Sequence, residues 1–220
     1  MTNTERRLLG RALFATNLLL LVAGLASQVV KYVFHHDYAH GLIPLFDLNA
    51  EANLPTWYSS MLLFAAALVA GRYAARIGTP RRRQWAMLSA VLLAFSVEEI
   101  ASLHEQGSEA MQAALGLSGV FFYAWVIPGM AVVALLAVVF FTFFRDMEPK
   151  LRRGLILGSL VFFGGALGLE MVGGALESAA GTRETLTYAI WAAAEESCEM
   201  FGSTIWLLTL LGGEKNNDVD

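Results

Sequence analysis

Six long apolar stretches are the feature of this sequence that most constrains its fold. A helix needs about 20 consecutive, mostly apolar residues to cross the hydrocarbon core of a bilayer, and each stretch reaches that length. The sequence therefore predicts an all-α protein, a bundle of six transmembrane helices. These helices are expected over residues 11–34, 56–77, 84–106, 121–144, 154–178 and 187–211.

The composition agrees with a membrane protein, since 56% of the 220 residues are hydrophobic and only 15% are charged. Soluble domains average about 25% charged residues. No linker or repeat divides the chain, so we expect one integral membrane domain over residues 1–212 and a disordered cytoplasmic tail over residues 213–220. The single cysteine, Cys198, excludes an internal disulfide and a cysteine-based zinc site. Nothing in the charge pattern indicates nucleic-acid binding.

The distribution of basic residues predicts the orientation, because cytoplasmic loops are enriched in Lys and Arg. Thirteen of the fifteen basic residues lie before the first helix, in the second and fourth connections, or after the last helix. They are Arg6, Arg7, Arg11, Arg72, Arg76, Arg81, Arg82, Arg83, Arg145, Lys150, Arg152, Arg153 and Lys215. Only Lys31 and Arg183 fall on the other side, so both termini are predicted to be cytoplasmic.

Three of the predicted helices carry ionisable side chains, although each costs roughly 2.5–3.5 kcal/mol on insertion. They are Glu98, Glu99, His104 and Glu105 in the third helix, Glu170 and Glu177 in the fifth, and Glu195, Glu196 and Glu199 in the sixth. At 1.5 Å per residue, Glu98 lies about 21 Å and Glu170 about 24 Å above the inner helix ends. The glutamates of the sixth helix lie about 12–18 Å below its outer end. All of them are therefore expected in the outer half of the membrane.

The spacing of these glutamates predicts one acidic stripe on each helix. Glu98 and Glu105 are two turns apart, as are Glu170 and Glu177, and the three glutamates of the sixth helix fall within a wedge of about 100°. Packing the stripes against each other keeps them away from lipid. The layer holds eight carboxylates, against which only Lys31 and a protonated His104 are expected as cations. Because like charges crowded in low dielectric cannot all ionise, the layer should bind protons or cations.

Carboxylate oxygens and histidine nitrogens suit iron, manganese or zinc, so we expect a divalent metal ion in this layer. The expected ligands are Glu98, Glu99, His104, Glu105, Glu170, Glu195, Glu196 and Glu199. The dimetal sites of helical bundles use Glu-x-x-His, whereas here His104 follows Glu99 by five residues and points away from Glu98 on an ideal helix. The alternative is that protonated glutamates hydrogen-bond the helices together.

The first outer connection holds three histidines, His35, His36 and His40. If the first helix continued, His36 and His40 would share a face and cap the acidic layer, and otherwise they are solvated loop residues. Lys31 has two interpretations as well. It either balances the acidic layer or extends to the membrane interface.

Two stretches resemble an uncharacterised family of bacterial multi-pass membrane proteins. They are FDLNAEANLPTWYSS at residues 46–60 and FSVEEIASLHEQ at residues 95–106. The family carries E-x-N-x-P-T-W-x-S-S before a helix and then S-x-[Asp/Glu]-E-x4-H-E, usually with Asp-Glu where this chain has two glutamates. The resemblance implies that Glu51, Asn53, Glu99, His104 and Glu105 belong to the family pattern. It also implies a location in the bacterial inner (plasma) membrane, and it brings no known activity.

We expect a metal-dependent membrane enzyme that acts on a lipid-soluble or periplasmic substrate from the outer half of the bilayer. Glu99 and Glu196 would provide a general base, and His104 would be a ligand or a proton shuttle.

Two further functions remain open from the sequence. A transporter or channel for protons or divalent cations would need a polar route through the inner half, where only Asn17, Thr142 and Ser159 are scattered. A structural subunit of a larger membrane complex is the other alternative.

Overall fold

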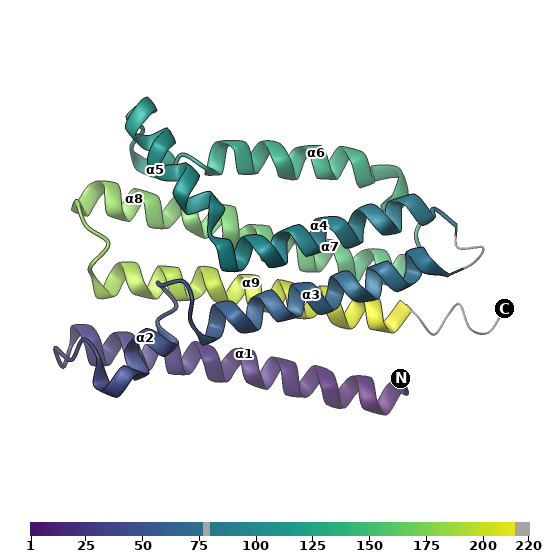
Figure 1. Cartoon of the computed structure of the whole chain (residues 1–220), viewed down its shortest axis with the longest axis horizontal. Helices are drawn as coiled ribbons and strands as arrows, with labels where there is room; N and C mark the ends of the chain where they lie inside the picture. Colours follow the sequence, from purple (N-terminus) through teal and green to yellow (C-terminus); the bar gives the residue numbers. More distant parts are fainter. Residues whose placement is uncertain (77–79, 214–220) are drawn as a thin grey trace.

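The structure, a computed structural model, describes residues 1–76 and 80–213, apart from the side chain of Glu109. Every regular element in these residues is helical. The long helices lie side by side along one axis, and the start of α1 and the end of α9 lie at the same end of the bundle (Figure 1). We call this the terminal end and the opposite one the distal end. The predicted tail at 214–220 and residue 77 of the second predicted helix lie outside the described residues.

Five helices are long and apolar enough to cross a membrane. They are α1 (Asn3–Tyr32), α3 (Leu54–Ala75), α4 (Arg82–Ala101), α6 (Val126–Arg145) and the continuous segment Pro149–Ala180, which comprises α7 (Pro149–Phe163), the π-helical η3 (Gly164–Leu169) and α8 (Glu170–Ala180). The sixth predicted span corresponds to α9 (Leu186–Gly213), which is 28 residues long but contains three glutamates. The short elements α2 (Leu42–Phe46), α5 (Leu103–Leu115), η1 (Ala39–Gly41) and η2 (Gly119–Phe121) lie at the distal end (Figure 1).

Local capping sets where several helices begin. Thr2 and Glu5 form a reciprocal capping box, so α1 begins eight residues before the predicted start. Asn53 caps α3 by accepting a hydrogen bond from the Thr56 backbone N–H at 3.0 Å. Pro149 stands in the first turn of α7, where the missing N–H has no helical acceptor to lose. The Asn-Leu-Pro-Thr sequence is therefore the start signal of the second long helix.

The predicted third span, residues 84–106, is wrong as one continuous helix. α4 ends at Ala101 because Ser102 adopts a left-handed backbone conformation with φ 47°, and α5 then continues in another direction. α5 also replaces most of the open connection expected over residues 107–120. The turn at Ser102 has no glycine to announce it, so periodicity alone misses it.

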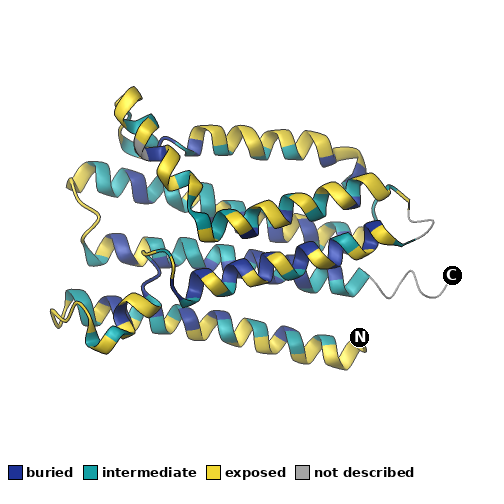
Figure 2. Cartoon of the chain, in the orientation of Figure 1, coloured by how far each residue is buried: buried dark blue, intermediate teal, exposed yellow. Residues whose placement is uncertain are grey.

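An apolar core fills the terminal half of the bundle. Tyr73 stacks on Trp85 with ring centroids 4.3 Å apart, and Phe162 stacks on Trp206 at 4.9 Å. The Tyr73 hydroxyl is satisfied by the Leu210 carbonyl at 2.9 Å. Figure 2 shows the buried residues on the facing sides of α3 and α9, whereas α6 is exposed along most of its length. The apolar core therefore lies between the polar residues of the distal half and the terminal end of the bundle.

Candidate functional site

Two adjoining cavities occupy the distal half of the bundle. The first, the distal chamber, has a volume of about 460 Å³ and lies among α5, α8, α9 and the segment before α6. The second, the side cavity, has a volume of about 410 Å³ and lies among α4, α6, η3 and α9. Five residues line both cavities and join them: Glu51, His104, Trp125, Glu195 and Glu196.

All eight predicted metal ligands line these cavities. Glu105 and Glu170 face the distal chamber, Glu98, Glu99 and Glu199 face the side cavity, and Glu195, Glu196 and His104 face both. The lining also contains Glu51 and Glu177, so nine carboxylates from separate helices and one loop surround a joined space. The structure thus brings together the side chains that the sequence placed in one acidic layer. Within the described chain, however, no three His, Cys, Asp or Glu side chains are placed closely enough to hold a metal ion.

The turn at Ser102 creates the contact between Glu98 and His104. A continuous helix would direct the two side chains apart, whereas the turn brings the His104 Nδ1 atom to 2.6 Å from Glu98 Oε1. The same carboxylate oxygen accepts the His104 backbone N–H at 3.1 Å. The sequence-based statement that His104 points away from Glu98 is therefore wrong. Because Glu98 fixes Nδ1 as the protonated nitrogen of the neutral ring, Nε2 is left with its lone pair.

The His104 ring packs on Trp125, with centroids 4.7 Å apart. Burial lowers the pKa of His104, but the hydrogen bond to Glu98 outweighs it, so the pKa lies above its ordinary value. The histidine is thus held in place from two sides, by a carboxylate and by an aromatic ring. A histidine oriented by a carboxylate is the usual form of a metal-binding or proton-transferring imidazole.

The ion pair between His104 and Glu98 predicts a pH dependence. Its contribution to stability is complete below the ordinary histidine pKa of about 6.5 and is lost as the pH rises through the raised pKa of the folded protein. Both side chains are partly exposed, so wild type should exceed Glu98→Gln by only about 0.5–1 kcal/mol near pH 6, and by less near pH 9. Thermal unfolding at the two pH values measures this difference. A difference that does not change with pH would show that His104 carries no charge.

The carboxylates of α9 lack any balancing cation. Glu196 and Glu199 have no hydrogen bond or ion pair to another residue in the described part of the chain, and their strongest electrostatic neighbour in each case is the carboxylate of Glu99. Glu195 is repelled most strongly by Glu170. The α9 stripe predicted from the spacing therefore faces the stripe of α4 and the start of α8.

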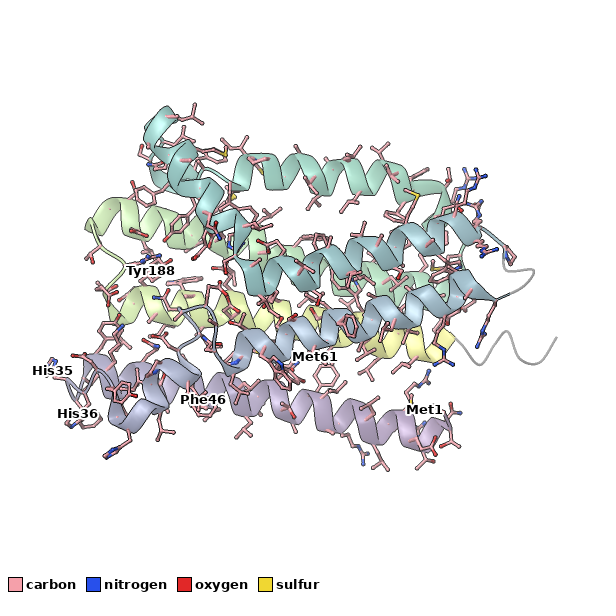
Figure 3. The ribbon with its side chains drawn as sticks, viewed as in Figure 1. Met1, His35, His36, Phe46, Met61 and Tyr188 are labelled. Carbon is pink, nitrogen blue, oxygen red and sulfur yellow. The ribbon has the colours of Figure 1, made fainter. Side chains whose placement is uncertain are left out.

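The aromatic residues around the distal chamber hold two other glutamates in place. The Trp125 indole N–H donates to Glu170 Oε1 at 2.8 Å, and the Tyr123 hydroxyl donates to Glu177 and lies 2.6 Å from the Tyr188 hydroxyl. Tyr188 is labelled in Figure 3 beside the distal end of α9. Neither Trp125 nor the two tyrosines was among the residues expected at the site from the sequence. No pattern in the sequence pairs Trp125 with Glu170, 45 positions away, or Tyr123 with Glu177, 54 positions away.

Glu51 is the site residue that the sequence placed only in a loop and in the family pattern. The loop is folded inward because Asn53 donates to the backbone carbonyls of Asp47 and Ala50. Burial, and after it repulsion from Glu105, raises the pKa of Glu51 above its ordinary value. Nearby, the Ser59 hydroxyl is fully buried beside Glu99 and has no hydrogen-bond partner of normal geometry. The buried Ser59 hydroxyl of α3 is thus left without a regular hydrogen bond beside the carboxyl of Glu99.

Two expectations about basic residues need correction. Lys31 is not a lining residue of either cavity and instead pairs with Glu184, with Nζ and Oε2 3.2 Å apart. The lining contains Arg183, which the sequence placed only in an outer loop. Of the two alternatives for the first-loop histidines, the structure favours solvated loop residues over a cap on the acidic layer. α1 ends at Tyr32, and His35 and His36 extend from the far distal tip of the bundle, away from the cavities (Figure 3).

A family described as a domain of unknown function, DUF8692, matches residues 12–212. The chain belongs to this family. The match begins within α1 and ends within α9, and it includes every residue that lines the two cavities, so the acidic site lies wholly inside the DUF8692 region. Neither the curated proteins nor the solved structures gave a match to the chain. Membership of DUF8692 agrees with the resemblance to an uncharacterised family and adds no activity, so the function must be argued from the site.

Proposed function

We propose that this chain is a bacterial inner-membrane protein with six spans, in which α9 is the sixth and both termini are cytoplasmic. Support comes from the length of α9, which runs beside α1, α3 and α7 through the bundle. The glutamates of α9 face the cavities, so its outer surface needs no charge in contact with lipid. The start of α1 and the end of α9 lie at the end that carries Arg81, Arg82 and Arg152, in line with the positive-inside rule. The cavities would then face the periplasmic side.

The proposed biochemical function is divalent-cation binding in the joined cavities, in support of a reaction on a lipid-soluble or periplasmic substrate. One observation carries this proposal. Nine carboxylates line the joined cavities, whereas Arg183 is the only Lys or Arg among the described lining residues. Crowded carboxylates in a poorly solvated space must bind protons or cations. Carboxylates together with an oriented imidazole suit iron, manganese or zinc.

The donors fit such an ion, although they do not converge in the arrangement described above. Glu99, Glu196 and Glu199 line the side cavity together, and rotation of their side chains would direct their oxygens toward a cation bound there. His104 would offer Nε2, since Glu98 holds its Nδ1. The bound ion would act as a Lewis acid, and Glu196 or Glu99 would take a proton from substrate or water.

A transporter for protons or divalent cations remains the second candidate, and a structural subunit the third. On α9 the cavity lining ends at Glu199, and the aromatic core around Tyr73, Trp85 and Trp206 fills the terminal half. A cavity that opens on one side only suits a binding protein or an enzyme better than a transporter.

Elemental analysis of detergent-purified protein tests the proposal. We expect one of the three metals in a near-stoichiometric amount, and at least about a tenfold loss of affinity in Glu99→Gln and in His104→Ala. Glu184→Gln is the matched control, because its carboxyl lies outside the cavities and pairs with Lys31. Absence of metal from the wild type after incubation with all three ions would overturn the proposal. Uptake of ions into proteoliposomes that Glu196→Gln abolishes would favour the transporter instead.

A further inference from the structure

The side cavity continues toward the terminal end as an apolar groove beneath α6. This lateral groove has a volume of about 430 Å³ and lies among α4, α6 and α7, with Trp206 of α9 at its base. It shares Phe95, Val133 and Phe163 with the side cavity, so the two spaces meet at a waist made by these three side chains. A single track therefore leads from the middle of the bundle surface to the acidic chamber.

The track is reached through the membrane, because α6 packs loosely on its neighbours. Its most extensive contact is with η3, and it has only sparse contact with α4 and α7. Figure 1 shows α6 standing apart from the other long helices. Close packing is found near the two ends of α6, at Gly129 against Leu167 and at Phe143 against Trp85, where the ring centroids are 5.0 Å apart. Since α6 is a membrane span, the exposed side of the groove faces lipid. An apolar groove in that position is filled by hydrocarbon chains.

The polar groups of the lateral groove are already satisfied. Ser159 donates to the Leu155 carbonyl at 2.9 Å, and the Trp206 indole N–H donates to the same carbonyl at 3.1 Å. At the terminal end of the groove, Arg145 donates to Asp146 at 2.8 Å and Arg152 donates to the Arg145 carbonyl at 2.9 Å. Away from these two arginines the described lining of the groove is apolar or already hydrogen-bonded, so this part of the groove is suited to a hydrocarbon chain.

The length of the track indicates a long single chain. From Gly129 to Arg145, α6 rises about 24 Å, whereas one leaflet occupies only about half of the 30 Å hydrocarbon core. A diacyl phospholipid anchored in one leaflet would not extend along the whole of this track.

The distal chamber selects the head group by charge. Its carboxylates accept hydrogen bonds and repel anions, and Arg183 alone offsets them among the described lining residues. We propose that the groove and the side cavity bind the chain of a long single-chain lipid whose head, uncharged or cationic and rich in hydrogen-bond donors, lies in the distal chamber. This inference rests on the proposed function, since it names the substrate class of the same site.

Photolabelling of the wild-type protein tests the inference without any variant. The probe is stearyl alcohol carrying a diazirine in mid-chain, added to chelator-treated protein in detergent. We expect the label on groove-lining residues of α6, such as Leu136, rather than on lipid-facing Leu135 and Val138. Stearylamine should compete with the probe and stearyl phosphate should not. Equal labelling of all faces of α6, or equal competition by the phosphate, would overturn the inference.

A pair of variants adds a second readout. Ala137→Trp fills the groove and should lower specific labelling by about tenfold. Ala131→Trp places the same side chain on the lipid-facing side of α6 and should leave labelling unchanged. Equal losses in both variants would overturn the inference. Metal content separates this inference from the proposed function. A protein that is labelled specifically but contains no metal would contradict only the proposed metal binding. A protein that contains metal but is not labelled in the groove would contradict only the proposed lipid binding.

Discussion

Glu196→Gln should stabilise the metal-free protein and weaken its stabilisation by metal. Glu196 interacts electrostatically with the carboxyl groups of Glu99, Glu51 and Glu170, and no Lys or Arg in the described part of the chain forms an ion pair with it. A pair of like charges about 6 Å apart at an effective dielectric of 20 repels by roughly 3 kcal/mol, so removing one partly neutralised charge should gain about 1–2 kcal/mol. For a chain of this length, 1 kcal/mol raises the unfolding midpoint by about 2–4 °C. The variant keeps the shape of the side chain, so packing contributes little to the change.

The metal-loaded protein should show the opposite change. At a free metal concentration of 100 times Kd, the wild type gains about 2.7 kcal/mol, and most of that gain should be absent in Glu196→Gln. Thermal unfolding with chelator and then with manganese, iron or zinc measures both effects. In the metal-free protein, Glu184→Gln should lower the stability slightly, whereas Glu196→Gln should raise it, because Glu184→Gln removes the ion-pair partner of Lys31. A less stable metal-free Glu196→Gln protein would contradict the prediction and favour a protonated glutamate that holds the helices together.

The second large effect is expected at Gly202, where α9 crosses α7. A Cβ atom built at Gly202 would lie 2.7 Å from the Phe162 backbone nitrogen and 2.8 Å from its Cα. Backbone atoms cannot rotate away, so Gly202→Val must push the two helices apart. We expect a loss of about 3 kcal/mol or more, beyond the usual range for overpacking, and a midpoint lower by about 6–12 °C.

Separating α7 from α9 should also disturb the cavities, because the two helices carry opposite walls of the side cavity. Metal retention and photolabelling should both fall in Gly202→Val. The control is Gly168→Ala in η3, where an added Cβ meets no atom within 4 Å. That change should leave stability within about 1 kcal/mol of wild type. Similar behaviour of the two variants would show that the close approach of α7 and α9 is not required.

The two parts of the site were accessible from the sequence to different degrees. The glutamates were expected at similar heights from counting residues along each predicted helix, because the rise per residue is constant. The structure places all eight predicted carboxylates and His104 in the lining of the two joined cavities. The relation of His104 to Glu98 could not be found this way, since it depends on the left-handed turn at Ser102. A left-handed backbone conformation at one residue changes the direction of the helix that follows, and with it the direction of that helix's side chains.

The sequence by itself indicated a helical membrane protein with several apolar helices of spanning length and a set of glutamates within them. These properties follow from hydropathy, which acts on each segment separately. The tertiary structure alone decided which groups meet: Glu51 turned inward by Asn53, Lys31 withdrawn to Glu184, and Arg183 brought to the chamber. It also decided that α6 stands apart above an apolar groove. Such contacts join residues far apart in the chain, and their energies depend on packing that no local pattern encodes.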